Sequence, residues 1–166
     1  MGGHILCYPL PHEPPPGPLA MNRIVHISPH FAVTGALQPD DFAQAAALGF
    51  RSIVSNLPDG ESQIHPTSQQ EAQLAADAGL GFRHIAVTKA EAFSDRVVEG
   101  MTNALGELEG PILAHCASGL RSAVAWAAAA ARGQPVDAVL AQLATAGFNL
   151  EPLRADLEEQ HDRGGV

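Results

Sequence analysis

Short runs of consecutive apolar residues alternate along the chain with longer segments in which apolar side chains recur at helical spacing. The short runs predict β-strands over residues 23–27, 31–34, 51–57 and 82–87, and a further strand that begins at Ile112. The longer segments predict helices over residues 39–48, 68–78, 122–132, 136–146 and 152–160, and another that begins at Asp95. Strands that alternate with helices indicate an α/β fold, with a largely parallel central sheet of four to five strands flanked by helices.

Two of the predicted helices begin with clear local signals. Pro39 stands at an early helical position, and Asp40 and Asp41 follow it where the first turn of a helix favours negative charge. Ser94 is a candidate N-cap for the helix that begins at Asp95. The residues between this helix and the preceding strand, 88–93, are predicted to form a loop.

The first 20 residues differ from the rest of the chain. They contain six prolines, show no apolar periodicity and lack the basic start and apolar core of a secretory signal. We therefore expect residues 1–20 to form a disordered or loosely attached tail, and residues 21–166 to form a single domain.

Composition and charge narrow the possible partners. The formal net charge of −9 argues against nucleic acid or an anionic membrane surface, because both need a basic face on the protein. No run approaches the roughly 20 apolar residues of a membrane span. Two cysteines give no disulfide framework, so a cytoplasmic location is expected. The alanine-rich helices between residues 122 and 147 could support a homodimer once the core has taken its apolar faces.

Metal and cofactor binding are poorly supported by the sequence. The chain has eight histidines, yet it contains neither a CxxC nor an HExxH spacing. It also lacks the GxxxxGK[ST] pattern of a nucleotide-binding phosphate loop. We therefore expect no cofactor and no metal ion.

The segment 112–122 carries the strongest chemical signal. Its apolar run ends at Cys116, the chain turns through Gly119, and a helix is predicted to follow. At a junction of this kind, loop amides and the positive end of a helix dipole favour an anion and the thiolate form of a cysteine. Arg121 adds a planar fork of donors that can hold two oxygens of a phosphate or related group. The simpler interpretation, a buried structural cysteine, explains neither the glycine nor the arginine.

At these residues the sequence resembles cysteine-dependent phosphatases of the tyrosine and dual-specificity type. The resemblance is strongest to a bacterial branch, once labelled a domain of unknown function, that is found beside β-lactamase-like hydrolases. It covers most of residues 24–150 and rests on Ile27-Ser28-Pro29 with Thr34-Gly35, on residues 49–57 and 83–87, and on His115-Cys116 with Arg121-Ser122. It implies a phosphatase-like fold in which the cysteine loop joins the last strand to a helix.

The resemblance also implies roles for individual residues. Cys116 would be the nucleophile, and the loop residues Ala117, Ser118, Gly119 and Leu120 would bind phosphate together with Arg121. Ser122 would donate to the thiolate, and His115 would orient the loop. The general acid would come from the loop after the strand at 82–87, where Glu91 and Asp95 are candidates, with Asp59 as a third. A weak acid favours phenolic leaving groups, so phosphotyrosine and other aryl phosphates are the expected substrates, on a phosphoprotein or a small molecule.

The length of the cysteine loop keeps two alternatives open. Four residues separate Cys116 from Arg121, whereas phosphatases of this type usually have five. The shorter loop resembles that of rhodanese-like sulfurtransferases, in which the cysteine carries a persulfide, and members of the bacterial branch have been labelled sulfurtransferases for this reason. The chain could also be a non-catalytic module that binds phosphate or another anion. Hydrolysis of a phosphate ester, sulfur transfer from thiosulfate, or binding without turnover would distinguish the three.

Overall fold

The computed structural model describes residues 23–164, and the tail predicted over residues 1–20 lies outside them. In chain order the elements are β1 (Val25–Ser28), β2 (Phe31–Thr34), α2 (Pro39–Ala47), β3 (Ser52–Ser55), α3 (Ser68–Asp77), β4 (Gly81–His84), α4 (Asp95–Glu107), β5 (Ile112–His115), α5 (Leu120–Ala130), α6 (Val136–Thr145), the short 3-10 helix η2 (Glu151–Leu153) and α7 (Arg154–Arg163). This order of strands and helices confirms the predicted α/β fold.

The strands form one five-stranded sheet in the order β1-β2-β5-β3-β4. Only β1 is antiparallel to its neighbour, and the pairs β2–β5, β5–β3 and β3–β4 are parallel. Strand β5 lies in the middle of the sheet and is buried along its whole length. The residue that follows β5 therefore leaves the sheet at the centre of its carboxyl edge, where ligands bind in open α/β sheets.

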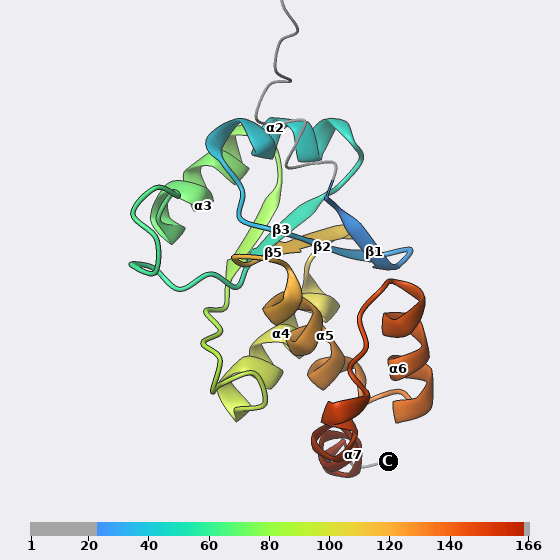
Figure 1. The fold of residues 1–166 in the computed structure, drawn as a ribbon. Helices are drawn as coiled ribbons and strands as arrows, with labels where there is room; N and C mark the ends of the chain where they lie inside the picture. The colour runs from blue at the N-terminus through green and yellow to red at the C-terminus, as the bar shows by residue number, and fades with distance from the viewer. Residues whose placement is uncertain (1–22, 165–166) are drawn as a thin grey trace, which may run out of the picture.

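Helices cover both faces of this sheet (Figure 1). Helices α2 and α3 lie on one face, and α4, α5, α6 and α7 lie on the other. Two apolar clusters match these layers, a smaller one that includes Phe42, Ile53 and Leu113 and a larger one that includes Val54, Trp126 and Leu143. Adjacent residues of β3 point to opposite faces, so Ile53 enters one cluster and Val54 the other. Burial on both faces explains why the strands are continuous apolar runs.

Most helix limits agree with the sequence signals. Pro39 opens α2, and Ser94 caps α4 by accepting a hydrogen bond from the Val97 amide at 3.3 Å. Helix α5 begins at Leu120, earlier than predicted, because Gly119 at its N-cap has a left-handed backbone with φ = 93°. The alanines of α5 pack into the core of the single chain and leave little of that face for a partner chain. The homodimer stays a prediction.

Strands β3 and β4 are shorter than the apolar runs 51–57 and 82–87 that predicted them. The backbone beyond their ends still pairs, since the Ile85 amide donates to the Ser55 carbonyl at 2.9 Å and the Val87 amide to the Asn56 carbonyl at 3.0 Å. The chain thus stays extended past the sheet and carries both segments toward the cysteine loop. Within residues 23–164, none of the helices combines the length and the apolar character that a membrane crossing requires.

Candidate active site

The carboxyl edge of the sheet brings three strand ends together beneath the cysteine loop. The Asn56 amide, just after β3, donates to the His115 carbonyl at 2.7 Å, and the Cys116 amide donates to the carbonyl of Thr34, the last residue of β2, at 3.4 Å. Cys116 is the first residue after β5 and is fully buried. The thiol therefore lies at the base of the loop, directly above the middle of the sheet.

The loop from Cys116 to Arg121 is tightly wound. The Gly119 amide donates a hydrogen bond to Cys116 Sγ at 3.1 Å. A Cβ at Gly119 would lie 3.4 Å from the Thr34 carbonyl oxygen, and the φ of 93° disfavours any L side chain there. Glycine is needed at this position because the loop must turn in a left-handed conformation against β2. The hydrogen bond from the Gly119 amide fixes the position of the sulfur at the base of the loop.

Arg121 lies in the first turn of α5 with its guanidinium at the edge of the cysteine loop. Its Nη1 donates to the Val87 carbonyl at 2.8 Å and to Glu61 Oε1 at 2.9 Å, and its Nη2 donates to Glu61 Oε2 at 2.6 Å. The hydrogen bonds to Glu61 are the main reason why the pKa of Arg121 is raised, and the side chain of Cys116 acts in the same direction. The arginine is therefore next to the thiol, as the sequence predicts for a shared nucleophile and anion site.

A cavity of about 590 Å³ opens beside this loop. Ala117, Ser118, Leu120 and Arg121 form one wall of it, and Glu61 with residues of the loop that follows β4 forms another. Apolar side chains supply most of the remaining surface; these are Ala92, Phe93, Val124 and Leu153. Lys89, the one lysine in the sequence, also lines the cavity. The site thus combines cationic groups at the loop with an apolar region next to them.

Ser122 is held by a residue that the sequence analysis did not single out. Its hydroxyl donates to Asn56 Oδ1 at 2.7 Å, while Asn56 Nδ2 donates to the Ile85 carbonyl at 2.8 Å. Both side chains are buried. A hydroxyl has one proton, so in this arrangement Ser122 anchors α5 to the strand ends. Its donation to the thiolate stays a prediction that requires the hydroxyl to rotate.

His115 points away from the cysteine, into the layer that α2 and α3 cover. Its Nε2 lies 2.7 Å from Glu71 Oε1, and Glu71 Oε2 accepts from Ser55 Oγ at 3.4 Å. All three side chains are buried. Asp41 is also buried, and burial is the main reason why its pKa is raised, although the nearby His115 acts in the opposite direction. A buried polar cluster therefore supports the strand that carries Cys116.

The carboxylates predicted as general acids do not line the cavity. Asp95 pairs with Arg163 on α7, and Glu91 lies 3.2 Å from Arg96 and accepts from Thr88 Oγ1 at 2.9 Å. The hydrogen bond from Thr88 is the first cause that lowers the pKa of Glu91.

Asp59, the third candidate, accepts from both the amide and the hydroxyl of Ser68, at 2.7 and 2.6 Å, and these bonds lower its pKa. Each candidate is therefore engaged with another partner, and the assignment of the acid stays a prediction.

Glu61 is the main site residue that the sequence analysis missed. It follows the turn Pro58-Asp59-Gly60, where an acidic residue is normally solvated. Its partner Arg121 is 60 positions away, a separation that no local spacing rule reaches. The sequence offered one signal that Arg121 needs an acidic partner. A half-buried guanidinium usually pairs with a carboxylate, and no acidic residue lies near Arg121 in the cysteine loop.

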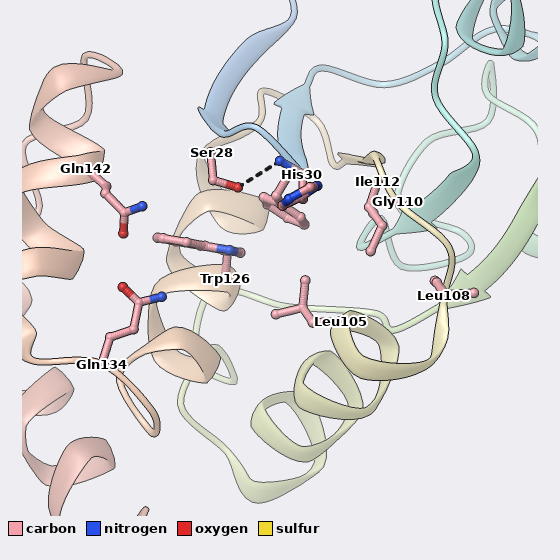
Figure 2. A pocket seen from close by; sticks show the side chains of 10 residues that line it. Ser28, His30, Leu105, Leu108, Gly110, Ile112, Trp126, Gln134 and Gln142 are labelled. Atoms are coloured by element: carbon pink, nitrogen blue, oxygen red, sulfur yellow. Dashed lines mark hydrogen bonds between the residues drawn. The ribbon is translucent and has the colours of Figure 1, made fainter.

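A second cavity, of about 520 Å³, lies at the amino ends of β2 and β5. Figure 2 shows the side chains that line it. It borders Phe31 and Ile112, the first residues of β2 and β5, whereas Cys116 follows the last residue of β5. Trp126 and the amide side chains of Gln134 and Gln142 also line it. This cavity contains neither Cys116 nor Arg121 and is separate from the candidate active site. Within residues 23–164, no group of three or more His, Cys, Asp or Glu side chains is placed to hold a metal ion.

Comparison with known proteins gives a consistent family assignment. The family model described as "Beta-lactamase hydrolase-like protein, phosphatase-like domain" matches residues 23–133. Beta-lactamase hydrolase-like proteins of Xylella fastidiosa (strain 9a5c) and Agrobacterium fabrum (strain C58) are 32% identical over 105 residues and 31% over 100 residues. These matches cover 63% and 60% of this chain but 24% and 23% of the relatives. The chain thus spans about a quarter of the length of the curated relatives that it matches.

Solved structures show the same fold. A candidate phosphatase of Neisseria meningitidis Z2491 is 33% identical, with a TM-score of 0.70 over 83% of this chain and 98% of that one. A candidate phosphatase of Shewanella putrefaciens CN-32 is 16% identical, with a TM-score of 0.62 over 87% of this chain and 94% of that one. Kinase-associated phosphatase is 15% identical, with a TM-score of 0.62 over 87% and 95% of the two chains.

Proposed function

Because the chain belongs to the phosphatase-like domain family of the beta-lactamase hydrolase-like proteins, we propose that it is a protein tyrosine phosphatase-like hydrolase, which cleaves phosphate monoesters through a phosphocysteine on Cys116. The observation that carries this proposal is the loop itself. Cys116 Sγ accepts a hydrogen bond from the Gly119 amide at 3.1 Å. Arg121, in the first turn of α5, lies next to the sulfur. A nucleophile and a fixed oxyanion partner in one loop are what displacement at phosphorus requires.

The reaction has two steps. In the first, the Cys116 thiolate forms a bond to phosphorus as the bond between phosphorus and the leaving oxygen breaks. In the second, water forms a new bond to phosphorus, the sulfur leaves as thiolate, and inorganic phosphate is released. The guanidinium of Arg121 and the amides of residues 117–121 hold the phosphoryl oxygens through both steps.

Two features of the cavity favour aryl phosphates over alkyl phosphates. Asp95 and Glu91 lie outside the cavity lining, and Glu61, the carboxylate that does line it, is paired with Arg121 and has a lowered pKa. A leaving group that departs without a strong general acid is therefore preferred. A phenol has a pKa of about 10, far below that of an alcohol, and leaves more easily as its anion. The side chains of Phe93, Val124 and Leu153 offer apolar contacts to an aromatic ring. Phosphotyrosine and small aryl phosphates are therefore the proposed substrates.

Hydrolysis of p-nitrophenyl phosphate by the wild-type protein and by Cys116→Ser tests the proposal. We expect turnover in the wild type and a loss of at least 10³-fold in the variant, since the nucleophile is removed. Circular dichroism of the variant controls for its fold. Turnover that survives the substitution, or that is absent from both proteins, contradicts the proposal.

The length of the loop favours one second candidate. Only four residues separate Cys116 from Arg121, which gives a smaller anion cradle. In a sulfurtransferase the Cys116 thiolate would take the outer sulfur of thiosulfate, release sulfite and pass the sulfur to cyanide or a thiol. Transfer of sulfur from thiosulfate to cyanide that depends on Cys116, without hydrolysis of p-nitrophenyl phosphate, would favour this reaction instead.

A further inference from the structure

We propose that the cavity at the amino ends of β2 and β5 is a binding site for a small uncharged aromatic amide. The cavity is separate from the cysteine loop, so this inference goes beyond the proposed function and does not depend on it. It rests on the polar groups of Gln142, Gln134 and Trp126, which line the cavity and have no hydrogen-bond partner within residues 23–164.

Gln142, on α6, supplies the clearest of these groups. Its Oε1 is buried and accepts no hydrogen bond from the described part of the chain. Its Nε2 donates none to the same residues, so the amide lacks a protein partner whichever way its oxygen and nitrogen are placed. A buried polar atom without a partner destabilises the folded protein, and such a group in a native structure calls for a functional explanation. A ligand that donates to Oε1 supplies one.

Gln134 and Trp126 add two further groups to the same cavity. Neither side chain forms a hydrogen bond with another described residue. Trp126 is only 4% exposed, and the indole Nε1–H of a buried tryptophan usually finds an acceptor. Figure 2 shows the amides of Gln142 and Gln134 pointing toward Trp126, whose nitrogen faces the space between His30 and Leu105. The cavity therefore offers both hydrogen-bond donors and acceptors to a ligand.

The size and the walls of the cavity suit a small molecule with an apolar body. The volume of about 520 Å³ lies within the range of roughly 300–1,000 Å³ that is typical of small-molecule sites. Apolar side chains form most of the wall; besides Trp126, these are Phe31, Leu105, Leu108 and Ile112. The Phe31 ring stacks on Trp126 with centroids 6.0 Å apart and an angle of 23° between the planes, which fixes the indole. Apolar walls with a few polar groups are the usual composition of a ligand pocket.

The charge of the lining favours an uncharged ligand. Among the described residues that line the cavity there is no Asp, Glu, Lys or Arg, and His30, the one that can titrate, is exposed. An ion in this cavity would lose its water without meeting an opposite charge. Gln142 Oε1 requires a donor on the ligand, and Trp126 Nε1–H requires an acceptor. An amide carries both groups, and an aromatic ring attached to it fits the apolar walls.

Benzamide, acetophenone and benzoate test this proposal, because they share one ring and differ in the group attached to it. Benzamide has both C=O and N–H, acetophenone lacks the N–H, and benzoate is charged. Trp126 is the one tryptophan in the sequence, so its indole N–H gives an identifiable signal in a proton–nitrogen NMR spectrum of the full chain. Titrations of the wild type, Gln142→Leu and the matched control Gln73→Leu then give the dissociation constants. Gln73 lies on α3, donates to Asp77 at 2.8 Å and does not line the cavity.

We expect the wild type to bind benzamide about fivefold more tightly than acetophenone and at least about tenfold more tightly than benzoate. In Gln142→Leu the preference for benzamide over acetophenone should disappear, because the acceptor is gone, whereas Gln73→Leu should keep it. A purely structural effect of Gln142→Leu would weaken both ligands equally and leave the preference unchanged, which would overturn the proposal. An indole signal that shows no saturable shift with benzamide, or equal binding of benzoate, would overturn it from the wild type alone, whether or not the variant folds.

Discussion

At the scale of single residues, the geometry of Arg121 carries the chemistry of the site. One guanidinium contacts the Val87 carbonyl and the Glu61 carboxylate from a position beside the thiol. A planar fork is needed for such a set of partners, and an ammonium group cannot reproduce it. The proposed anion site is compatible with the overall charge of −9, because the attraction would come from fixed local donors.

Replacement of this guanidinium gives a direct test. We expect Arg121→Lys to lower kcat/KM for an aryl phosphate by about 10²–10³-fold, the size of effect seen when one donor to a developing oxyanion is lost. Steady-state kinetics measure the change, and Arg83→Lys, which alters an exposed pair with Glu107, is the control. A loss of less than threefold in Arg121→Lys would show that the fork does not contact the substrate.

Asp41 makes a prediction about pH. Burial raises its pKa above that of an ordinary carboxyl, so the folded protein binds this proton more tightly than the unfolded chain does. The ionised form of Asp41 therefore lowers the free energy of unfolding at pH values above the raised pKa. This destabilisation disappears as the pH falls to the pKa that Asp41 has in the unfolded chain.

We expect Asp41→Asn to raise the free energy of unfolding at pH 7 and to have little effect near pH 3.5, since a neutral side chain avoids this penalty. Urea unfolding at several pH values measures the difference. A variant that is less stable than the wild type at pH 7 would mean that the Asp41 charge is favourable, through His115 or the Gln38 amide.

At the scale of elements, Asn56 connects three parts of the fold. Its backbone pairs with β5, its Nδ2 donates to the segment after β4, and its Oδ1 accepts from Ser122 on α5. A buried amide with this set of partners keeps the cysteine loop and the start of α5 aligned with the sheet.

Removal of this connection should destabilise the protein. We expect Asn56→Leu to lower the free energy of unfolding by roughly 1–3 kcal/mol, because the Ile85 carbonyl and the Ser122 hydroxyl both lose a buried partner. In a double-mutant cycle with Ser122→Ala, we expect a coupling of at least about 0.5 kcal/mol. Urea unfolding supplies all four values, and strictly additive effects would refute the contact between Asn56 and Ser122.

At the same scale, the sequence predicted the elements better than the contacts. The apolar runs and capping residues predicted where strands and helices lie along the chain, because local periodicity reflects the burial of side chains directly. The pairs Arg121–Glu61 and His115–Glu71 join positions 60 and 44 residues apart. Such pairs depend on how the segment after β3, including α3, meets the end of β5 and the start of α5 in space. The cysteine loop was predictable because its chemistry lies within six consecutive residues.

At the scale of the whole molecule, the described residues form one sheet with an apolar cluster on each face. The described members of the two apolar clusters run from Ile24, just before β1, to Leu157 in α7. The domain boundary placed near Met21 is therefore a prediction that truncation can test.

We expect a chain that begins at Met21 to keep the melting temperature and the kcat of the full-length protein, because it retains both clusters and the cysteine loop. Thermal unfolding and hydrolysis of p-nitrophenyl phosphate measure the two properties. A melting temperature lower by several degrees, which corresponds to about 1 kcal/mol or more, would show that the first 20 residues contribute to the folded domain.

The central claim is that Cys116 carries a phosphoryl group during turnover. Rapid acid quenching of the reaction with an aryl phosphate, followed by mass spectrometry of the peptide that contains Cys116, tests it most directly. We expect one phosphoryl group on Cys116 in the wild type and none in Cys116→Ser. A Cys116 peptide that stays unmodified during measurable hydrolysis, or that gains sulfur from thiosulfate but no phosphoryl group from the ester, would contradict the account.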